Sequence, residues 1–471
     1  MSHMIYPSRV LPLAHPDHVL STAELMGHTP RRSEALRVLD LGCGTGTHAL
    51  AAAETLPQAT FDLIDRSAEC VATARLRAAQ VGLDTRVTVH HGDLLEADLE
   101  PADVVLCWGV FSWIPQADHA RLLTRIRACL RPGGVALVSW NVLPGWHMYG
   151  LIRDVLRFHT RNLTDPEQMV HEARRILGFL GTYTGHDRDD YAGLLHHVRE
   201  QFQTLPDGYL FHEYLCEHNH PVALNTFAHL ADQNGLRFLG EAAPDHASPD
   251  QFPEEVRAML EAEREQRSDP LYVEQLIDFL RNTRFRASIL VREDDRRTVS
   301  PTPAQYHWRA AFDDLTAVSG DLQADGTDGV SAAANHALAN LLKQVDDARP
   351  AWVCGTRLGG NTPAGDEAIL RAWRLGWIHP RKHPPALAAS PSASTTCSPL
   401  ARLLAHVGED LPSLTGEPIA TDHMGRALVG LADGRSRAEL LAAWSDALGQ
   451  ALPRTAVDDA LHQLWRQGLL R

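Results

Sequence analysis

The sequence predicts an α/β fold, in which a mostly parallel sheet has helices on both faces and mainly helical units follow it. Three observations support this prediction. Five short apolar runs alternate with helical patterns over the first 140 residues, the links between them are short, and the first run ends in a glycine-rich turn. Such alternation is typical of parallel sheets, because each crossover places its helix on one face of the sheet.

The five apolar runs are the first five strands. They comprise residues 38–41, 61–65, 86–93, 102–109 and 135–140. Each run is short and rich in aliphatic side chains, as expected for strands that are buried on both faces. Helical patterns at about 67–81 and 118–131 lie between them, and the second ends at a Pro-Gly-Gly turn, which favours a break in the chain.

The alternation stops after the fifth strand. Residues 148–202 have a mostly helical pattern, and alternation resumes at residue 224. We interpret residues 236–242 and 287–293 as the last two strands of the same sheet. The stretch at about 149–220 is then a helical insertion over the strand ends.

The remainder contains two similar segments. Residues 368–381 and 460–471 share a helical pattern, a tryptophan, a glycine and a short apolar stretch, and each predicts the end of a winged-helix-like unit. A loop-like stretch lies at 319–329. The sequence thus predicts five parts: a core at 1–148, a helical lid or regulatory region with the last two strands at 149–295, a winged-helix-like unit at 296–382, a Pro/Ser/Ala-rich linker at 383–399, and a second winged-helix-like unit at 400–471.

Composition excludes several functional classes. The 471 residues carry 44 Lys and Arg against 59 Asp and Glu, a formal charge of −15, which disfavours binding to nucleic acid. Seven dispersed cysteines without a C-x-x-C pair predict neither disulfides nor a structural zinc. No apolar run is long enough to span a bilayer and no secretory signal is evident, so we expect a cytoplasmic protein without membrane insertion.

The strongest chemical signal is the turn after the first strand, Asp40-Leu-Gly42-Cys43-Gly44-Thr-Gly46. Its glycines permit a tight turn and a close approach of a ligand to the backbone beside a helix N-terminus. The spacing G-x-G-x-G differs from that of dinucleotide-binding proteins, and no Lys-Ser/Thr pair follows, as a P-loop would require.

Carboxylates end the next two strands. Asp65 lies 19 residues after Gly46, where doubly wound folds hydrogen-bond ribose hydroxyls. Asp93 ends the third strand, where a carboxylate can accept a hydrogen bond from an adenine amino group. Arg66 and Leu94 follow these two residues, and Leu94 is expected to flank the base.

This set resembles the class I S-adenosylmethionine-dependent methyltransferases, which have a Rossmann-like sheet. The resemblance implies that Asp40 and the turn from Gly42 to Gly46 surround the methionine end of the cofactor, Asp65 its ribose and Asp93 its adenine. It implies S-adenosyl-L-methionine as cofactor and S-adenosyl-L-homocysteine as product, with no metal. Methyl transfer from a sulfonium depends mostly on positioning and desolvation.

Further stretches resemble one bacterial subfamily. They are residues 6–19, 108–115, 141–154, 212–222 and 274–290. These stretches are similar to protein lysine methyltransferases that carry a methyltransferase regulatory domain, some of which modify outer-membrane proteins. The resemblance implies a lysine of a bacterial protein as acceptor. The chain departs from the family at Trp108, which stands where His is more common, and at Trp140 and Leu143, where Tyr is favoured.

Acceptor-side candidates lie after strands four and five, because ligands of open α/β sheets bind at the carboxyl ends of strands. The catalytic candidates are His147, Asn141 and Trp146, and His147 is the candidate proton acceptor. Trp108 and Phe111 are further candidates for binding the cofactor. The candidates for binding the substrate are Tyr6, Ser112, Trp113, Trp140, Glu213 and Tyr214. Aromatic faces attract both a sulfonium and an ammonium. Each assignment competes with a structural one: core packing for the aromatic residues, helix capping for His147 and a turn for Glu213 and Tyr214.

Two other functions stay open at this point. The acceptor can be a small molecule or a natural-product peptide rather than a protein. The chain can also be a non-catalytic S-adenosylmethionine sensor that binds DNA, but residues 400–471 carry seven Arg, no Lys and nine acidic residues, and a DNA-binding unit would be basic. The sequence does not indicate the oligomeric state.

Overall fold

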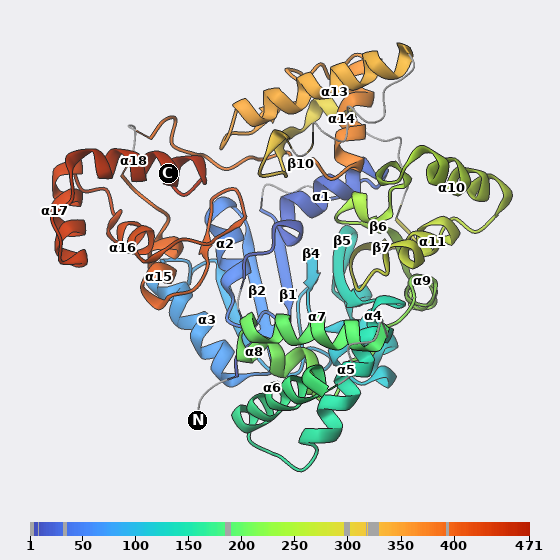
Figure 1. The fold of residues 1–471 in the computed structure, drawn as a ribbon. Helices are drawn as coiled ribbons and strands as arrows, with labels where there is room; N and C mark the ends of the chain where they lie inside the picture. Colours follow the sequence, from blue (N-terminus) through green and yellow to red (C-terminus); the bar gives the residue numbers. More distant parts are fainter. Residues whose placement is uncertain are drawn as a thin grey trace.

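The computed structural model describes residues 4–7, 9–31, 35–183, 190–295, 302–316, 318, 329–391 and 395–471. Its centre is a seven-stranded sheet with the order β3-β2-β1-β4-β5-β7-β6 (Figure 1). The strands are β1 (Arg37–Leu41), β2 (Thr60–Asp65), β3 (Val87–His91), β4 (Ala102–Cys107), β5 (Leu130–Asn141), β6 (Leu236–Glu241) and β7 (Phe285–Arg292). The α/β sheet expected from the sequence is confirmed, including its last two strands.

The strand order decides where a ligand can bind. Strands β1 to β5 are parallel, whereas β7 runs antiparallel to both β5 and β6. The chain proceeds outward from β1 to β3 on one side and from β4 onward on the other. The carboxyl ends of β1 and β4 therefore flank a topological switch point, where open α/β sheets bind ligands.

Alternate residues of the strands fill two cores, one on each face of the sheet. Val38 packs with α1 (Pro16–Leu25), α2 (Thr47–Thr55) and α3 (Ala68–Gln80), whereas Leu39 packs on the other face. The second face is covered by α4 (His119–Cys129) and α9 (Leu224–Gln233). This pattern follows from the period of two along a strand.

A helical lid lies across the carboxyl ends of the strands (Figure 1). It consists of α5 (Gly145–Thr160), α6 (Pro166–Tyr183), α7 (Asp190–Thr204), α8 (Asp207–Leu210) and a π-helical turn at Phe211–Leu215. Its own small core includes Ile152, Leu177 and Phe202. After β6, helices α10 (Glu254–Gln266) and α11 (Tyr272–Arg281) lead back to β7.

Two further units surround the other sides of the sheet (Figure 1). The first has a three-stranded antiparallel sheet, and its elements are β8 (His307–Ala310), α13 (Gly329–Asp347), β9 (Val353–Cys354), α14 (Pro363–Arg374) and β10 (Ile378–Arg381). The second contains α15 (Pro399–Val407), β11 (Leu411–Pro412), β12 (Pro418–Ile419), α16 (His423–Leu431), α17 (Arg437–Leu448) and α18 (Arg454–Arg466). The helix and strand expected at 368–381 are present as α14 and β10. In the similar segment at 460–471, the helix is present as α18, but in place of a strand Leu470 forms an isolated bridge with Cys397. The loop expected at 319–329 lies outside the described residues except for Gly329, which begins α13.

Two elements begin earlier than the sequence predicts. Strand β5 begins at Leu130 rather than residue 135, because Leu130 pairs with Ala102 before the Pro-Gly-Gly sequence and the irregularity falls inside the strand. The lid begins at Gly145, inside the core predicted for 1–148. A side chain there would lie 2.5 Å from the carbonyl oxygen of Thr283, so α5 starts in close contact with the segment before β7.

All seven cysteines are free thiols. Among the described helices, none is both long and apolar enough to cross a membrane.

Candidate active site

The glycine-rich turn after β1 leaves open space at one position. Gly42, Gly44 and Gly46 have positive φ angles of 83°, 54° and 75°. A Cβ atom on Gly42 would lie 2.4 Å from Cγ2 of Val110, whereas a Cβ on Gly44 would meet no protein atom within 4 Å. Glycine is therefore needed for protein packing at Gly42, and the backbone at Gly44 faces free space that a ligand can occupy.

Asp65 ties the end of β2 to this turn. Its Oδ2 accepts a hydrogen bond of 2.8 Å from the Gly44 amide, and its Oδ1 accepts one of 2.8 Å from the Ser67 amide. Each carboxylate oxygen can accept a second hydrogen bond. The side chain thus holds the turn in place and retains acceptor capacity for the hydroxyls of a bound ribose.

A second carboxyl lies beneath the turn. Asp40 is buried, and burial together with the nearby charge of Asp65 raises the pKa of its carboxyl to about 7. Burial also raises the pKa of the Cys43 thiol, which disfavours the thiolate that a nucleophile requires. A ligand that brings positive charge close to the carboxylates of Asp40 and Asp65 would be stabilised by them. The sulfonium and ammonium groups of S-adenosylmethionine meet this condition, so the residues fit that cofactor.

The side expected to hold adenine is more open. Arg66 and Asp93 are exposed, and Leu94 is half-buried at the edge of the core. Asp65 pairs with His91 in the sheet, so the ends of β2 and β3 lie next to each other. Asp93 Oδ1 accepts a hydrogen bond of 2.9 Å from the Leu95 amide, which fixes the turn after β3.

A hydrogen bond between two asparagines joins the end of β5 to the segment that follows the π-helical turn. Asn141 Nδ2 donates to Asn219 Oδ1 at 3.0 Å. Among the described residues, Asn219 Nδ2 is a buried donor without a partner. Ser112 Oγ accepts from the Asn141 amide at 2.8 Å, and the Ser112 carbonyl accepts from the His220 amide at 2.8 Å, so Ser112 positions the backbone. Asn219 was missed as a candidate, although it lies in the stretch 212–222.

Aromatic side chains of the lid meet Trp113, which comes from the short helical turn after β4. The rings of Trp113 and Trp146 are perpendicular, with centroids 6.4 Å apart. Trp146 also contacts Tyr149 at 6.1 Å and Tyr214 at 6.5 Å. The structure therefore brings together three of the predicted acceptor-side residues, Trp113, Trp146 and Tyr214. Tyr149 was missed because the spacing within α5 shows only that it is buried.

Glu213 is a buried carboxyl in the same region. Its Oε1 accepts a hydrogen bond of 3.1 Å from the Tyr6 hydroxyl, and burial raises the pKa of Glu213 to about 7 despite that bond and nearby Arg153. Burial raises the pKa of Tyr209 to about 12, and its ring lies 5.8 Å from that of Tyr6. The N-terminal segment and the π-helical turn thus enclose one carboxyl among phenol rings.

Three predicted site residues lie elsewhere. Phe111 is fully buried against His119 and Phe227, so it belongs to the core and offers no face to a cofactor. Trp140 is also a core residue: its ring stacks on Phe227 at 4.3 Å and its Nε1 donates to Ser288 Oγ at 3.0 Å.

His147 differs from both, because it is exposed in the first turn of α5 rather than enclosed by the aromatic residues. Trp108 is half-buried beside the ring of Phe285, at a centroid distance of 5.3 Å.

Within the described part of the chain, no cluster of three or more His, Cys, Asp or Glu residues could hold a metal ion.

Comparison with known proteins agrees with this geometry. Residues 38–134 match the methyltransferase domain, and residues 206–292 match the predicted methyltransferase regulatory domain. An uncharacterised protein of Rickettsia prowazekii (strain Madrid E) is 28% identical over 291 residues, which are 61% of this chain and 52% of that protein. The match thus spans about half of that relative. A second protein of the same organism is 26% identical over 236 residues, 50% of this chain and 94% of the relative.

The fold also matches solved structures over nearly its whole length. PKMT2 from Rickettsia typhi superposes with a TM-score of 0.79 at 20% identity, covering 99% of both chains. The same protein in complex with AdoHcy gives a TM-score of 0.77 at 21% identity, again with 99% of both chains covered. The chain therefore contains a methyltransferase domain at residues 38–134, followed by a match to the predicted methyltransferase regulatory domain at residues 206–292, and its overall fold is similar to that of PKMT2.

Proposed function

We propose that this methyltransferase acts on the side-chain amine of lysine in a protein. The observation that supports this acceptor is the enclosed carboxyl of Glu213, which lies among Tyr6, Tyr209 and Tyr214 above the strand ends. A carboxylate and aromatic faces are the groups that recognise an ammonium ion. The likeness to PKMT2, a protein lysine methyltransferase, supports the same acceptor.

The amine must lose a proton before it reacts, because free lysine has a pKa of about 10.4. Glu213 is suited to accept this proton, since a carboxyl whose pKa is about 7 is half ionised near neutral pH. Tyr6 donates to one oxygen of Glu213 and leaves the other for the amine. In this proposal Glu213 replaces the exposed His147 as the proton acceptor.

On the cofactor side, we assign the turn from Gly42 to Gly46 to the methionine end, and Asp40 to the positive charge. Asp65 would hold the ribose, and Arg66, Asp93 and Leu94 would surround the adenine. When bound, S-adenosylmethionine supplies an electrophilic methyl group. Trp113 and Trp146 exclude water from the acceptor side, and the Asn141–Asn219 pair offers a free amide N–H that can orient the acceptor.

Labelled methyl transfer tests this function. The full-length protein is incubated with methyl-labelled S-adenosylmethionine and, separately, with cytosolic protein, cell-envelope protein and a small-molecule extract. We expect label in a protein fraction and methylated lysine in the peptides that mass spectrometry identifies. Label only in small molecules, or on another side chain, would contradict the lysine assignment; cofactor binding without transfer to any fraction would favour a sensor.

A further inference from the structure

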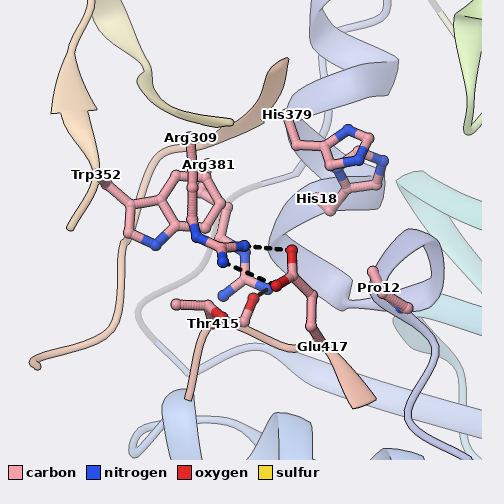
Figure 2. Close-up of a pocket in the computed structure, with 8 residues that line it drawn as sticks. All are labelled: Pro12, His18, Arg309, Trp352, His379, Arg381, Thr415 and Glu417. Carbon is pink, nitrogen blue, oxygen red and sulfur yellow. Dashed lines mark hydrogen bonds and ion pairs between the residues drawn. The ribbon is translucent and has the colours of Figure 1, made fainter. Parts of the chain in front are cut away.

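A small cavity lies where three parts of the chain meet, and none of its lining residues belongs to the candidate active site (Figure 2). Helix α1 contributes His18, strands β8 and β10 contribute Arg309, His379 and Arg381, and the β11–β12 segment contributes Thr415 and Glu417. The space open to the centre of a water-sized sphere is about 10 Å³. This is about the smallest cavity that admits one water molecule or one monatomic ion.

The sheet register explains why two arginines share this cavity. His379 pairs with Arg309 across the antiparallel strands β10 and β8. Arg381 lies two residues beyond His379, so all three side chains project from the same face of the sheet. The sequence therefore places two guanidinium groups side by side at a buried junction.

Only one of the two arginines has a carboxylate partner. Arg309 forms a two-pronged ion pair with Glu417, in which Nη2 lies 2.7 Å from Oε2. Arg381 is also buried, donates from Nη2 to the Thr415 carbonyl at 2.9 Å and lies over the ring of Trp352 at 4.9 Å. Among the described residues, no carboxylate lies within ion-pair distance of Arg381, although the charges of Asp17 and Glu417 act on it from farther away.

Four nitrogen atoms of residues that line the cavity have no hydrogen-bond partner among the described residues. They are Arg309 Nε, Arg381 Nη1, His379 Nδ1 and Trp352 Nε1. Both arginine atoms are obligate donors, and His379 Nδ1 donates in one tautomer. Burial and the nearby charges lower the pKa of His379 to about 3, which keeps this ring neutral and leaves the positive charge on the arginines.

From these contacts we infer that the cavity binds one monatomic anion of the size of chloride, held by Arg381, Arg309 and His379. An anion can accept from these donors and offset the buried charge of Arg381, which has no ion-pair partner among the described residues. The bound anion would join α1, the β8–β10 sheet and the β11–β12 segment. Its role is structural and does not depend on the proposed reaction.

Thermal unfolding of the full-length protein tests this site. The melting temperature is measured in sodium chloride, sodium bromide and sodium gluconate at equal ionic strength. An anion at ten times its dissociation constant would raise the melting temperature of a chain of this length by about 1–2 °C. We expect this rise in chloride and bromide but not in gluconate, which is too large to enter. Equal melting temperatures in all three salts would overturn the proposal.

Two further measurements keep the test independent of folding defects. Arg381→Gln should abolish the difference between chloride and gluconate, whereas Arg77→Gln should preserve it. Arg77 is a matched control because it is buried and joins α3 to Glu409 of the C-terminal unit, outside the cavity.

Anomalous scattering from a bromide-soaked crystal of the unmodified protein should show one bromide between Arg309 and Arg381. A water molecule there, or an unchanged halide effect in Arg381→Gln, would contradict the site.

Discussion

The two sides of the candidate active site are built over very different distances along the chain. On the cofactor side, Gly44 and Asp65 are 21 positions apart and belong to consecutive strand–turn units. On the acceptor side, Tyr6 and Glu213 are 207 positions apart, and Asn141 and Asn219 are 78 apart. The cofactor side therefore follows from a local motif, while the acceptor side forms only once the lid and the N-terminal segment have packed together.

This difference predicts that substitutions on one side leave the function of the other intact. Acceptor-side changes should alter turnover or acceptor affinity at nearly constant cofactor affinity, and changes in the glycine turn should do the reverse. The following variants test that separation.

The largest effect is expected for Glu213→Gln. Losing a general base typically lowers turnover by about 100- to 1,000-fold, while affinity for S-adenosylmethionine should change by less than about twofold. Because the base acts when deprotonated, the activity of the unmodified protein should rise with pH through about 7, and the variant should lack this limb. Steady-state kinetics and calorimetry measure the two quantities.

Glu217→Gln is the matched control, since Glu217 is exposed four residues later. Turnover of Glu213→Gln within about threefold of the unmodified protein would remove Glu213 from the mechanism.

Gly44→Ala should act on the cofactor side alone. The added methyl group would enter the free space beside the turn, and we expect about 30-fold weaker binding of S-adenosylmethionine, equal to about 2 kcal/mol. Gly82→Ala is a close control, because Gly82 also has a positive φ, 70°, and open space around its Cβ position. Equal loss of cofactor affinity in both variants would indicate backbone strain rather than a blocked ligand site.

Trp146→Leu should weaken the acceptor side. Removing one aromatic wall is expected to raise KM for the acceptor protein by about tenfold, in line with about 1.4 kcal/mol for a desolvated cation–π contact. Trp146→Phe should restore most of this loss because it keeps an aromatic face. A fall in cofactor affinity that exceeds the change in KM would place Trp146 on the cofactor side instead.

Tyr6→Phe should have the smallest effect. The Tyr6 hydroxyl stabilises the ionised form of Glu213, so its removal should raise the pKa of Glu213. The acidic limb of the pH–activity profile is then expected to move upward by about half a pH unit. An unchanged limb would show that Tyr6 and Glu213 act independently, and a limb shifted to lower pH would contradict the hydrogen bond.

The sheet and the glycine-rich turn after its first strand could be predicted almost completely from the sequence, because each depends on short-range patterns. The first apolar run, the glycines and a carboxylate at the end of the second run lie within about 30 residues. The acceptor side could be predicted only in part. The structure brings the predicted residues Trp113, Trp146 and Tyr214 together and adds Tyr149, Tyr209 and Asn219 as neighbours that the sequence did not single out, whereas it packs Phe111 and Trp140 in the core. The roles of these residues stay predictions.

The sequence by itself therefore determined the order of strands and helices along the chain and the glycine-rich turn after the first strand, since these follow from periodicity and local backbone geometry. Only the tertiary structure decided which aromatic rings are packed in the core and which line the lid, because Trp140 and Trp146 occur in similar apolar surroundings six residues apart. It alone also brought Arg309, Arg381 and Glu417 together. Burial and ionisation depend on neighbours from distant parts of the chain, and these neighbours are set by packing.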